Sequence, residues 1–194
     1  MPNLIQLLPT HIANQIAAGE VIQRPGSAVK ELLENAVDAG ATEIRLIVED
    51  AGKAVLQVVD NGKGMSEDDA RNCFERHATS KITGIEDLQK IKTMGFRGEA
   101  LPSIASVSHL VLRTRTRDSD AGTEIRVNAG AIASVTEVGM APGTIVEVGD
   151  LFYNLPARRK FLKSDVGETT QVAGIISIPA TRQSAPRGVA VSRE

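Results

Sequence analysis

The stretch that decides the fold runs from residue 25 to residue 65 and reads PGSAVKELLENAVDAGATEIRLIVEDAGKAVLQVVDNGKGM. Apolar residues recur in its first part at alternating steps of three and one, which is the spacing of one face of an amphipathic helix. These residues are Val29, Leu32, Leu33, Ala36 and Val37. The spacing predicts a helix over residues 25–38, with Gly40 where a C-terminal cap belongs.

The second part of the stretch has the pattern of a β-hairpin. The runs TEIRLIVED (42–50) and KAVLQVVD (53–60) are rich in β-formers and are separated by a short Ala51-Gly52 turn. Further strands are predicted at 109–115, at 124–127 with a sequel through 131–138, and at 144–148, and a short helix is predicted near 99–105. This order favours an α+β fold, a two-layer sandwich, over a doubly wound parallel sheet.

Composition excludes several classes of protein. The chain has 194 residues, with 22 Lys and Arg against 24 Asp and Glu, a single Cys and no Trp. One Cys cannot form an internal disulfide, so a reducing cytosol is the default compartment. No apolar run reaches the ~18 residues that a membrane span requires. Four Phe and one Tyr cannot build a base-stacking platform.

Three segments are predicted to lie outside the core. Residues 1–10 are expected to form an extended arm without a local partner. Residues 76–99 mix Gly, Thr, Ser, Lys and Arg, which predicts a long surface excursion, and excursions of this length are often functional. Residues 164–194 are rich in Gly, Ser, Thr and Pro and are expected to be a linker or a poorly folded tail.

Polar residues of the predicted helix and of the following loop could serve one site. Glu31, Asn35 and Asp38 project from one edge of the helix, and Asp60 ends a strand immediately before Gly62 and Gly64. Each feature also has an ordinary explanation. A lone E-x-x-x-N is usually a solvated helix edge, and D-N-G-K-G is by itself a common turn.

Two further glycine motifs follow later in the chain. Gly95-Phe96-Arg97-Gly98 precedes a helix and could cradle phosphate, and Gly143-Thr144 lies on a late strand. The ordered set is much less expected by chance than any one of its members. Because the chain contains neither G-x-x-x-x-G-K-[ST] nor G-x-G-x-x-G, a P-loop ATPase and a Rossmann enzyme are disfavoured.

Five longer strings carry a resemblance to a known family. They are IANQIAAGEVIQRPGSAVKELLENAVDAGA (12–41), DNGKGM (60–65), RHATSK (76–81), GFRGEAL (95–101) and LFYNLPARRKFLK (151–163). They resemble the N-terminal ATPase domain of the MutL mismatch-repair family, within the GHKL group of ATPases. The resemblance covers residues 1–163 and implies a GHKL (Bergerat) ATPase domain, with helices on one face of a mixed, mainly antiparallel sheet.

The resemblance also implies roles for individual residues. Glu31 would be the general base that activates water, and Asn35 would hold the Mg²⁺ that bridges the phosphates of ATP. Asp60 would accept from the adenine amino group, with Gly62, Gly64 and Thr144 around the base and Asp38 and Met65 as further pocket residues. Residues 76–99 would be the ATP lid: Thr79, Ser80, Lys81, Gly95, Phe96, Arg97 and Gly98 would close over the triphosphate, and Leu101 would lie at the far hinge.

Partners are implied in the same way. Lid closure in the family orders the N-terminal arm across a second subunit, so a nucleotide-dependent homodimer is expected, together with a MutS-type mismatch-recognition protein, a downstream nuclease or helicase, and weak non-specific DNA contact. The expected location is the cytoplasm, with no membrane attachment.

Family members continue into a helix and a second domain that supplies a Lys to the γ-phosphate. Residues 164–194 show no such pattern, so the chain is expected to be truncated, to bind ATP, and to have weak or absent turnover.

The sequence leaves the roles of several other residues undecided, and it leaves two alternative functions. Arg113, Arg115 and Arg117, like Arg158, Arg159, Lys160 and Lys163, could contact DNA phosphates or simply form solvated basic faces. Cys73 is expected in the core, and no His is assigned catalytic work. Two alternative functions remain: a catalytically silent binding or dimerisation module, and another GHKL enzyme such as a topoisomerase subunit.

Overall fold

The computed structural model describes residues 7–75, 78, 98–176 and 188–193. The helices are α1 (Thr10–Val21), α2 (Pro25–Asp38), η1 (Asp50–Gly52), α3 (Glu67–Asn72), α4 (Ala100–Ser106), α5 (Pro156–Lys160) and α6 (Asp165–Ile176). The strands are β1 (Glu43–Glu49), β2 (Val55–Asp60), β3 (His109–Arg115), β4 (Gly122–Asn128), β5 (Ala131–Val138), β6 (Gly143–Gly149) and β7 (Gly188–Arg193). The helix predicted over 25–38 and the hairpin predicted from 42 to 60 are therefore confirmed.

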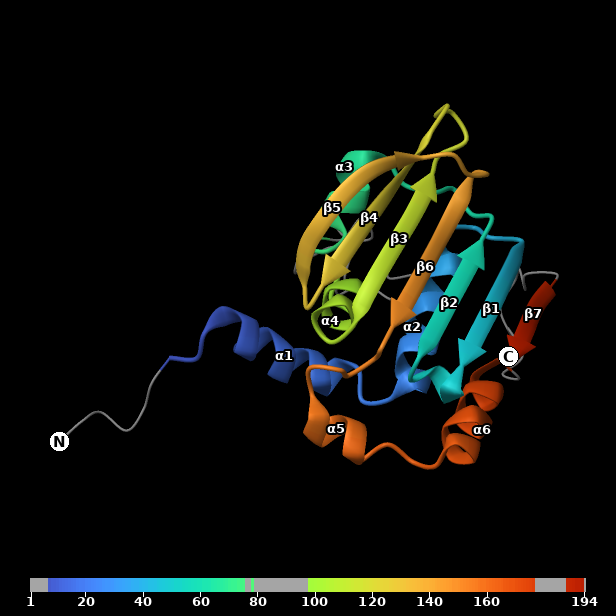
Figure 1. Cartoon of the computed structure of the whole chain (residues 1–194). Coiled ribbons are helices and arrows are strands. Elements are labelled where there is room, and N and C mark those ends of the chain that lie inside the picture. The colour runs from blue at the N-terminus through green and yellow to red at the C-terminus, as the bar shows by residue number, and fades with distance from the viewer. Residues whose placement is uncertain (1–6, 76–77, 79–97, 177–187, 194) are drawn as a thin grey trace, which may run out of the picture.

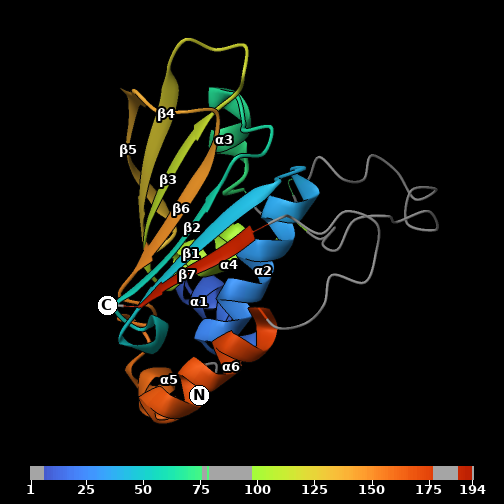
Figure 2. The same cartoon turned by 90° about the vertical axis from the view of Figure 1, so that its right-hand side faces the viewer.

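The strands form one sheet in the order β5-β4-β3-β6-β2-β1-β7 (Figure 1). Neighbouring strands are antiparallel, except that β7 runs parallel to β1. Seen edge-on, α1, α2, α4 and α6 lie on one side of the sheet, and none of the described helices covers the other side (Figure 2). The predicted two-layer α+β sandwich with a mixed, mainly antiparallel sheet is confirmed.

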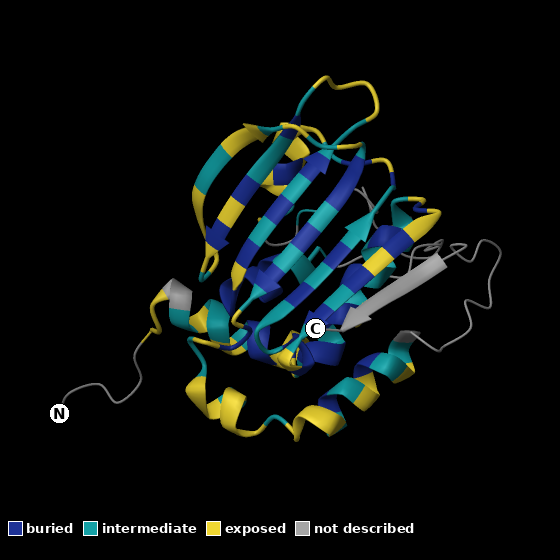
Figure 3. Ribbon diagram, turned by 45° about the vertical axis from the view of Figure 1, so that its right-hand side comes forward, coloured by how far each residue is buried: buried dark blue, intermediate teal, exposed yellow. Residues whose placement is uncertain are grey.

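Alternation along the strands places the core between these two layers. Along the strands, buried residues alternate with less buried ones (Figure 3). On the helix-facing side, two cross-strand rows are wholly apolar. One row is Leu46, Val58, Val146, Leu112 and Ile125, and the next is Val48, Leu56, Val148, Leu110 and Val127. Leu32 and Ala36 of α2 are buried in the same core cluster. Burial of these side chains is the main driving force for folding.

The expectation for residues 164–194 is wrong where the structure describes them. Residues 165–176 form α6, and residues 188–193 form β7. Val172 of α6 belongs to the core, so the helix is held by packing rather than by its composition. Helix propensity is a weak prior that tertiary contacts override. Part of the predicted arm and most of the predicted lid, residues 1–6, 76–77 and 79–97, lie outside the described residues.

Candidate nucleotide-binding site

A polar row ends the otherwise apolar inner face of the sheet. It follows the two apolar rows in register and consists of Asp60, Thr144, Thr114 and Thr123, beside Ile44 of β1. Thr114 and Thr144 are buried, and Asp60 is half-buried. Polar groups are costly to bury unless they find partners. This row therefore marks the place on the inner face where a polar ligand can be recognised.

Asp60 is held in a fixed position by backbone amides. The amide of Gly62 donates to its Oδ1 at 2.8 Å, and the amide of Thr144 also donates to the carboxylate. Burial raises the pKa of Asp60 above its ordinary 3.8, although these two amides oppose the rise. A carboxylate fixed in this way at the end of a strand can accept a hydrogen bond from an amino group with defined geometry.

The loop after Asp60 is fastened to both layers. The amide of Lys63 donates to the carbonyl of Ala39 at the end of α2, at 3.0 Å. The amide of Met65 donates to Oγ1 of Thr114 at 2.9 Å, and this hydroxyl in turn lies 3.1 Å from the carbonyl of Gly143. The glycine loop, the end of α2 and the strands β3 and β6 thus form one connected unit.

Thr114 is a residue that sequence reasoning missed. Its Oγ1 also lies 3.1 Å from Oγ1 of Thr144, so it connects two residues of the site. The signal was present in the alternation of β3, where Leu110 and Leu112 point inward and a threonine takes the next inward position. A polar residue in place of an expected apolar one was the clue.

The site residues on α2 lie on the C-terminal two-thirds of that helix. Glu31 and Asn35 are one turn apart and half-buried, and Asp38 is the last residue of the helix. Lys30 is bound more closely to Glu34, at 2.7 Å, than to Glu31, at 3.7 Å. The Glu31 carboxylate is therefore the more weakly paired of the two acids.

A cleft of about 520 Å³ lies beside the glycine loop. Its lining contains three of the predicted site residues, Gly62, Gly64 and Met65, but not Glu31, Asn35 or Asp60. The remaining lining residues were not among the predicted nucleotide-site residues: Ala39, Gly40, Lys63, Ser66, Asp69, Thr116, Arg117 and Asp118. The cleft brings the loop after β3 next to the loop after β2.

The remaining predicted site residues divide into two groups. Gly98 and Leu101 are described, with Gly98 just before α4 and Leu101 half-buried within it. Gly98 also has a positive φ of 64°. Thr79, Ser80, Lys81, Gly95, Phe96 and Arg97 lie outside the described residues.

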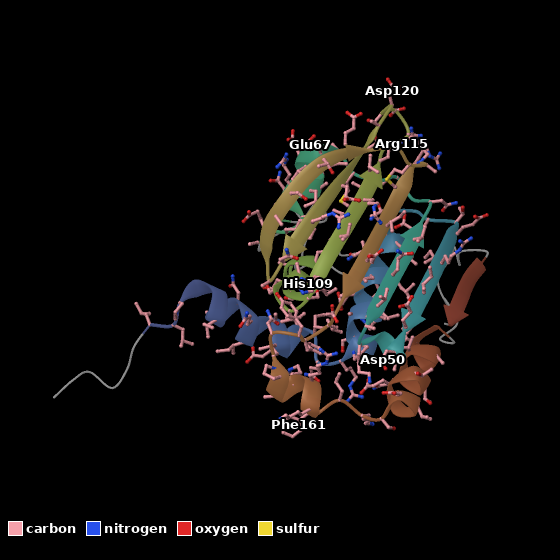
Figure 4. All side chains as sticks on the ribbon, viewed as in Figure 1. Asp50, Glu67, His109, Arg115, Asp120 and Phe161 are labelled. Atoms are coloured by element: carbon pink, nitrogen blue, oxygen red, sulfur yellow. The ribbon has the colours of Figure 1, made fainter. Side chains whose placement is uncertain are left out.

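The basic side chains that were considered as DNA contacts differ in their exposure and in their partners within the protein. Arg113 is paired with Glu124 at 2.6 Å on the sheet face opposite the helices, so it is engaged within the protein. The Arg115 side chain donates to the carbonyl of Asp120 at the end of the hairpin (Figure 4). The Arg158 guanidinium packs on Gly19 of α1. Arg159 and Lys160 remain exposed on α5, next to the exposed Phe161.

Gly64 and Gly40 form a matched pair for testing the loop. Their φ angles are 68° and 75°, but a Cβ at Gly64 would lie 2.0 Å from the Arg115 carbonyl oxygen, whereas one at Gly40 would meet nothing within 4 Å. We expect Gly40→Ala to cost the conformational strain alone, about 1–3 kcal/mol, and Gly64→Ala to cost clearly more because backbone must move. Urea unfolding of both variants checks this, and equal losses would contradict it.

A comparison with protein-family models decides the family. Residues 23–147 match the model described as histidine kinase-, DNA gyrase B-, and HSP90-like ATPase. The chain belongs to this ATPase family. The matched range contains α2, the β1–β2 hairpin, the glycine loop and the polar row. Membership in the ATPase family therefore rests on the same elements that build the site.

Curated relatives of this ATPase-family member are DNA mismatch repair proteins named MutL. The protein from Parabacteroides distasonis is 60% identical over 168 residues, which is 87% of this chain and 27% of the relative. The protein from Solibacter usitatus is 53% identical over 173 residues, which is 89% of this chain and 26% of the relative. The chain thus spans about a quarter of the length of these relatives.

Solved structures agree with this comparison. The Aquifex aeolicus MutL ATPase domain complexed with ADP has a TM-score of 0.63 and 40% identity, and the match covers 80% of this chain and 54% of that one. The N-terminal domain of a DNA repair protein has a TM-score of 0.71 and 32% identity, covering 84% of this chain and 47% of that one. Both support the same ATPase fold.

Proposed function

We propose that this chain binds ATP with Mg²⁺, hydrolyses it with weak turnover, and serves DNA mismatch repair as a MutL-type ATPase module. The observation that carries the proposal is the polar row around Asp60, which lies in register at the end of an apolar sheet face and is joined through Lys63 to the end of α2. The relatives support it, since one solved neighbour is an ATPase domain complexed with ADP.

The donor set of the site fits Mg²⁺. Within the described residues, no cluster of three or more His, Cys, Asp or Glu could hold a metal ion by itself. Mg²⁺ keeps several waters and binds through one or two protein oxygens plus substrate phosphates. The Asn35 amide oxygen would be such a ligand. When bound, Mg²⁺ neutralises charge on the phosphates.

The chain's own residues then have separate tasks. Asp60, fixed by the amides of Gly62 and Thr144, accepts from the adenine amino group and so selects the base. Glu31 accepts the proton of the attacking water. Gly64 and Met65 complete the pocket beside the base, with Asp38 at the end of α2. Positioning and charge neutralisation supply most of the catalysis in phosphoryl transfer.

Closure of the site is assigned to the lid. Thr79, Ser80, Lys81, Gly95, Phe96, Arg97 and Gly98 cover the triphosphate, and Leu101 marks the far end of this segment. Lid closure commits the nucleotide and excludes water. The same closure drives homodimerisation through the N-terminal arm, in which Leu7 and Leu8 are exposed.

Further partners follow from the proposed role in repair. They are a MutS-type mismatch-recognition protein, a downstream nuclease or helicase, and DNA held weakly by exposed cations such as Arg159 and Lys160. We place the protein in the cytoplasm. Among the described helices, none has the length and apolar character that crossing a bilayer requires.

The first test is calorimetric titration with a non-hydrolysable ATP analogue and Mg²⁺, combined with light scattering. We expect binding and a doubled mass. Binding without a change of mass would remove the dimerisation part of the proposal. No binding would overturn the nucleotide site itself.

Replacing Asn35 by Ala tests the metal ligand. We expect the variant to fold normally and to lose the Mg²⁺-dependent part of its ATP affinity, because the amide oxygen no longer contributes to metal binding. Titrations with Mg²⁺ and with excess chelator should then give the same affinity in the variant and different affinities in the wild type. A wild-type affinity in the presence of Mg²⁺ would contradict the assignment.

A further inference from the structure

Helix α2 is fastened at its two ends by different parts of the molecule. Its C-terminal end is bound to the glycine loop through the Lys63 amide and the Ala39 carbonyl, and Gly62 lies so close that an added Cβ would be 2.8 Å from the Cβ of Ala39. This contact is the one that adjoins Asp60.

The N-terminal end of α2 is held by α6 and η1. The Arg24 guanidinium, from the residue that precedes the helix, donates to Oε1 of Gln171 on α6. A Cβ added at Gly26 would lie 3.1 Å from Cδ1 of Ile175, so the two helices are in close contact there. The first turn of α2 also has no side-chain cap of its own. A Cβ added at Gly52 of η1 would lie 2.9 Å from the Cβ of Pro25, so both α6 and η1 help to position this end of the helix.

Helix α6 is itself firmly placed. Lys53 lies 2.6 Å from Asp165, the first residue of α6, and 3.2 Å from Asp50 of η1. Glu168 is fully buried, and its Oε1 accepts the amide of Lys163 at 2.9 Å. Val172 is packed in the core. The helix can therefore act as a support rather than as a loose extension.

We infer that Gln171 is a positioning residue, which sets the place of Glu31 by fixing the first turns of α2 through Arg24. The inference rests on the proposed function, in which Glu31 is the general base. Nucleotide recognition depends on Asp60 and on the opposite end of α2. Loosening the α6 contact should therefore lower turnover much more than it lowers affinity, because small displacements of a catalytic group slow the reaction strongly.

The test compares Gln171→Ala with Gln171→Glu and Thr170→Ala. We expect kcat of Gln171→Ala to fall about tenfold with KM within about twofold of wild type. Gln171→Glu keeps an acceptor for Arg24 and should retain kcat. Thr170→Ala is the matched control, since the Thr170 hydroxyl donates to the Val166 carbonyl of its own helix. A wild-type kcat in Gln171→Ala, or an equal loss in Gln171→Glu, would overturn the inference.

A second measurement needs no nucleotide. Amide hydrogen exchange of Gln171→Ala should become faster in residues 27–31 and stay unchanged in residues 36–39 and 61–65. Unchanged exchange in residues 27–31 would also overturn the inference. If the wild type neither binds nor hydrolyses ATP, the proposed function fails, and the exchange experiment still decides whether α6 positions α2.

Discussion

Replacing Glu31 by Gln is expected to lower ATP turnover about 10²–10⁴-fold, the usual contribution of a general base. Gln has nearly the same shape as Glu and can still orient a water molecule, but it cannot accept the proton. Affinity for a non-hydrolysable ATP analogue should stay within about twofold of wild type, because an interaction used only in the transition state does not affect ground-state binding. Single-turnover hydrolysis and calorimetry measure the two quantities.

Glu34→Gln is the matched control for this experiment. Glu34 lies on the same helix and is ion-paired with Lys30 at 2.7 Å, but it has no assigned role in the reaction. Its loss should leave turnover close to wild type, since an ion pair whose lysine is exposed contributes little. Turnover that survives Glu31→Gln would exclude Glu31 as the essential base and would favour the catalytically silent binding module.

The second large effect is expected from Asp60→Asn. ATP affinity should fall about 100-fold or more, because the amide nitrogen would face the adenine amino group, donor against donor, in a site built around an acceptor. Calorimetric titration measures the loss. Asp120→Asn, at the exposed tip of the β3–β4 hairpin, is the control and should bind like wild type. An affinity within tenfold of wild type would contradict the role of Asp60.

The stability of Asp60→Asn should rise, although its ATP affinity falls. Because burial raises the pKa of Asp60, the folded chain holds this proton more tightly than the unfolded chain does. Ionisation of Asp60 therefore costs folding free energy as the pH rises from the ordinary 3.8 through the raised pKa. Asn has no charge to bury, and the two lone pairs of its Oδ1 can accept from the amides of Gly62 and Thr144.

At neutral pH, Asp60→Asn should accordingly be at least as stable as wild type. The advantage should shrink as the pH falls from the raised pKa to the ordinary 3.8 and should be gone below it, where Asp60 is neutral in both the folded and the unfolded chain. Urea unfolding at a series of pH values checks this sign. A variant that is less stable at neutral pH and does not change with pH would contradict it. Loss of binding together with a gain in stability is typical of a functional residue kept at a structural cost.

The predicted elements differ in how far the sequence could specify them. Helix α2 matched its prediction at both ends because its apolar spacing and its flanking Pro and Gly all indicate the same structure. Helix α6 was missed because DVGETTQVAGII contains two glycines and two threonines, and its own pattern does not favour a helix. Contact with α2 and η1 holds it as a helix in the folded chain.

The sequence by itself determined the α+β class, the hairpin, the position of Asp60 at a strand end and the order of the motifs, because these depend on local periodicity and turn chemistry. Only the tertiary structure decided which distant residues meet. Thr114 supports Met65 across 49 positions, and Gln171 meets Arg24 across 147. Such partners are set by sheet register and by helix packing, which arise when the whole chain buries its apolar surface at once.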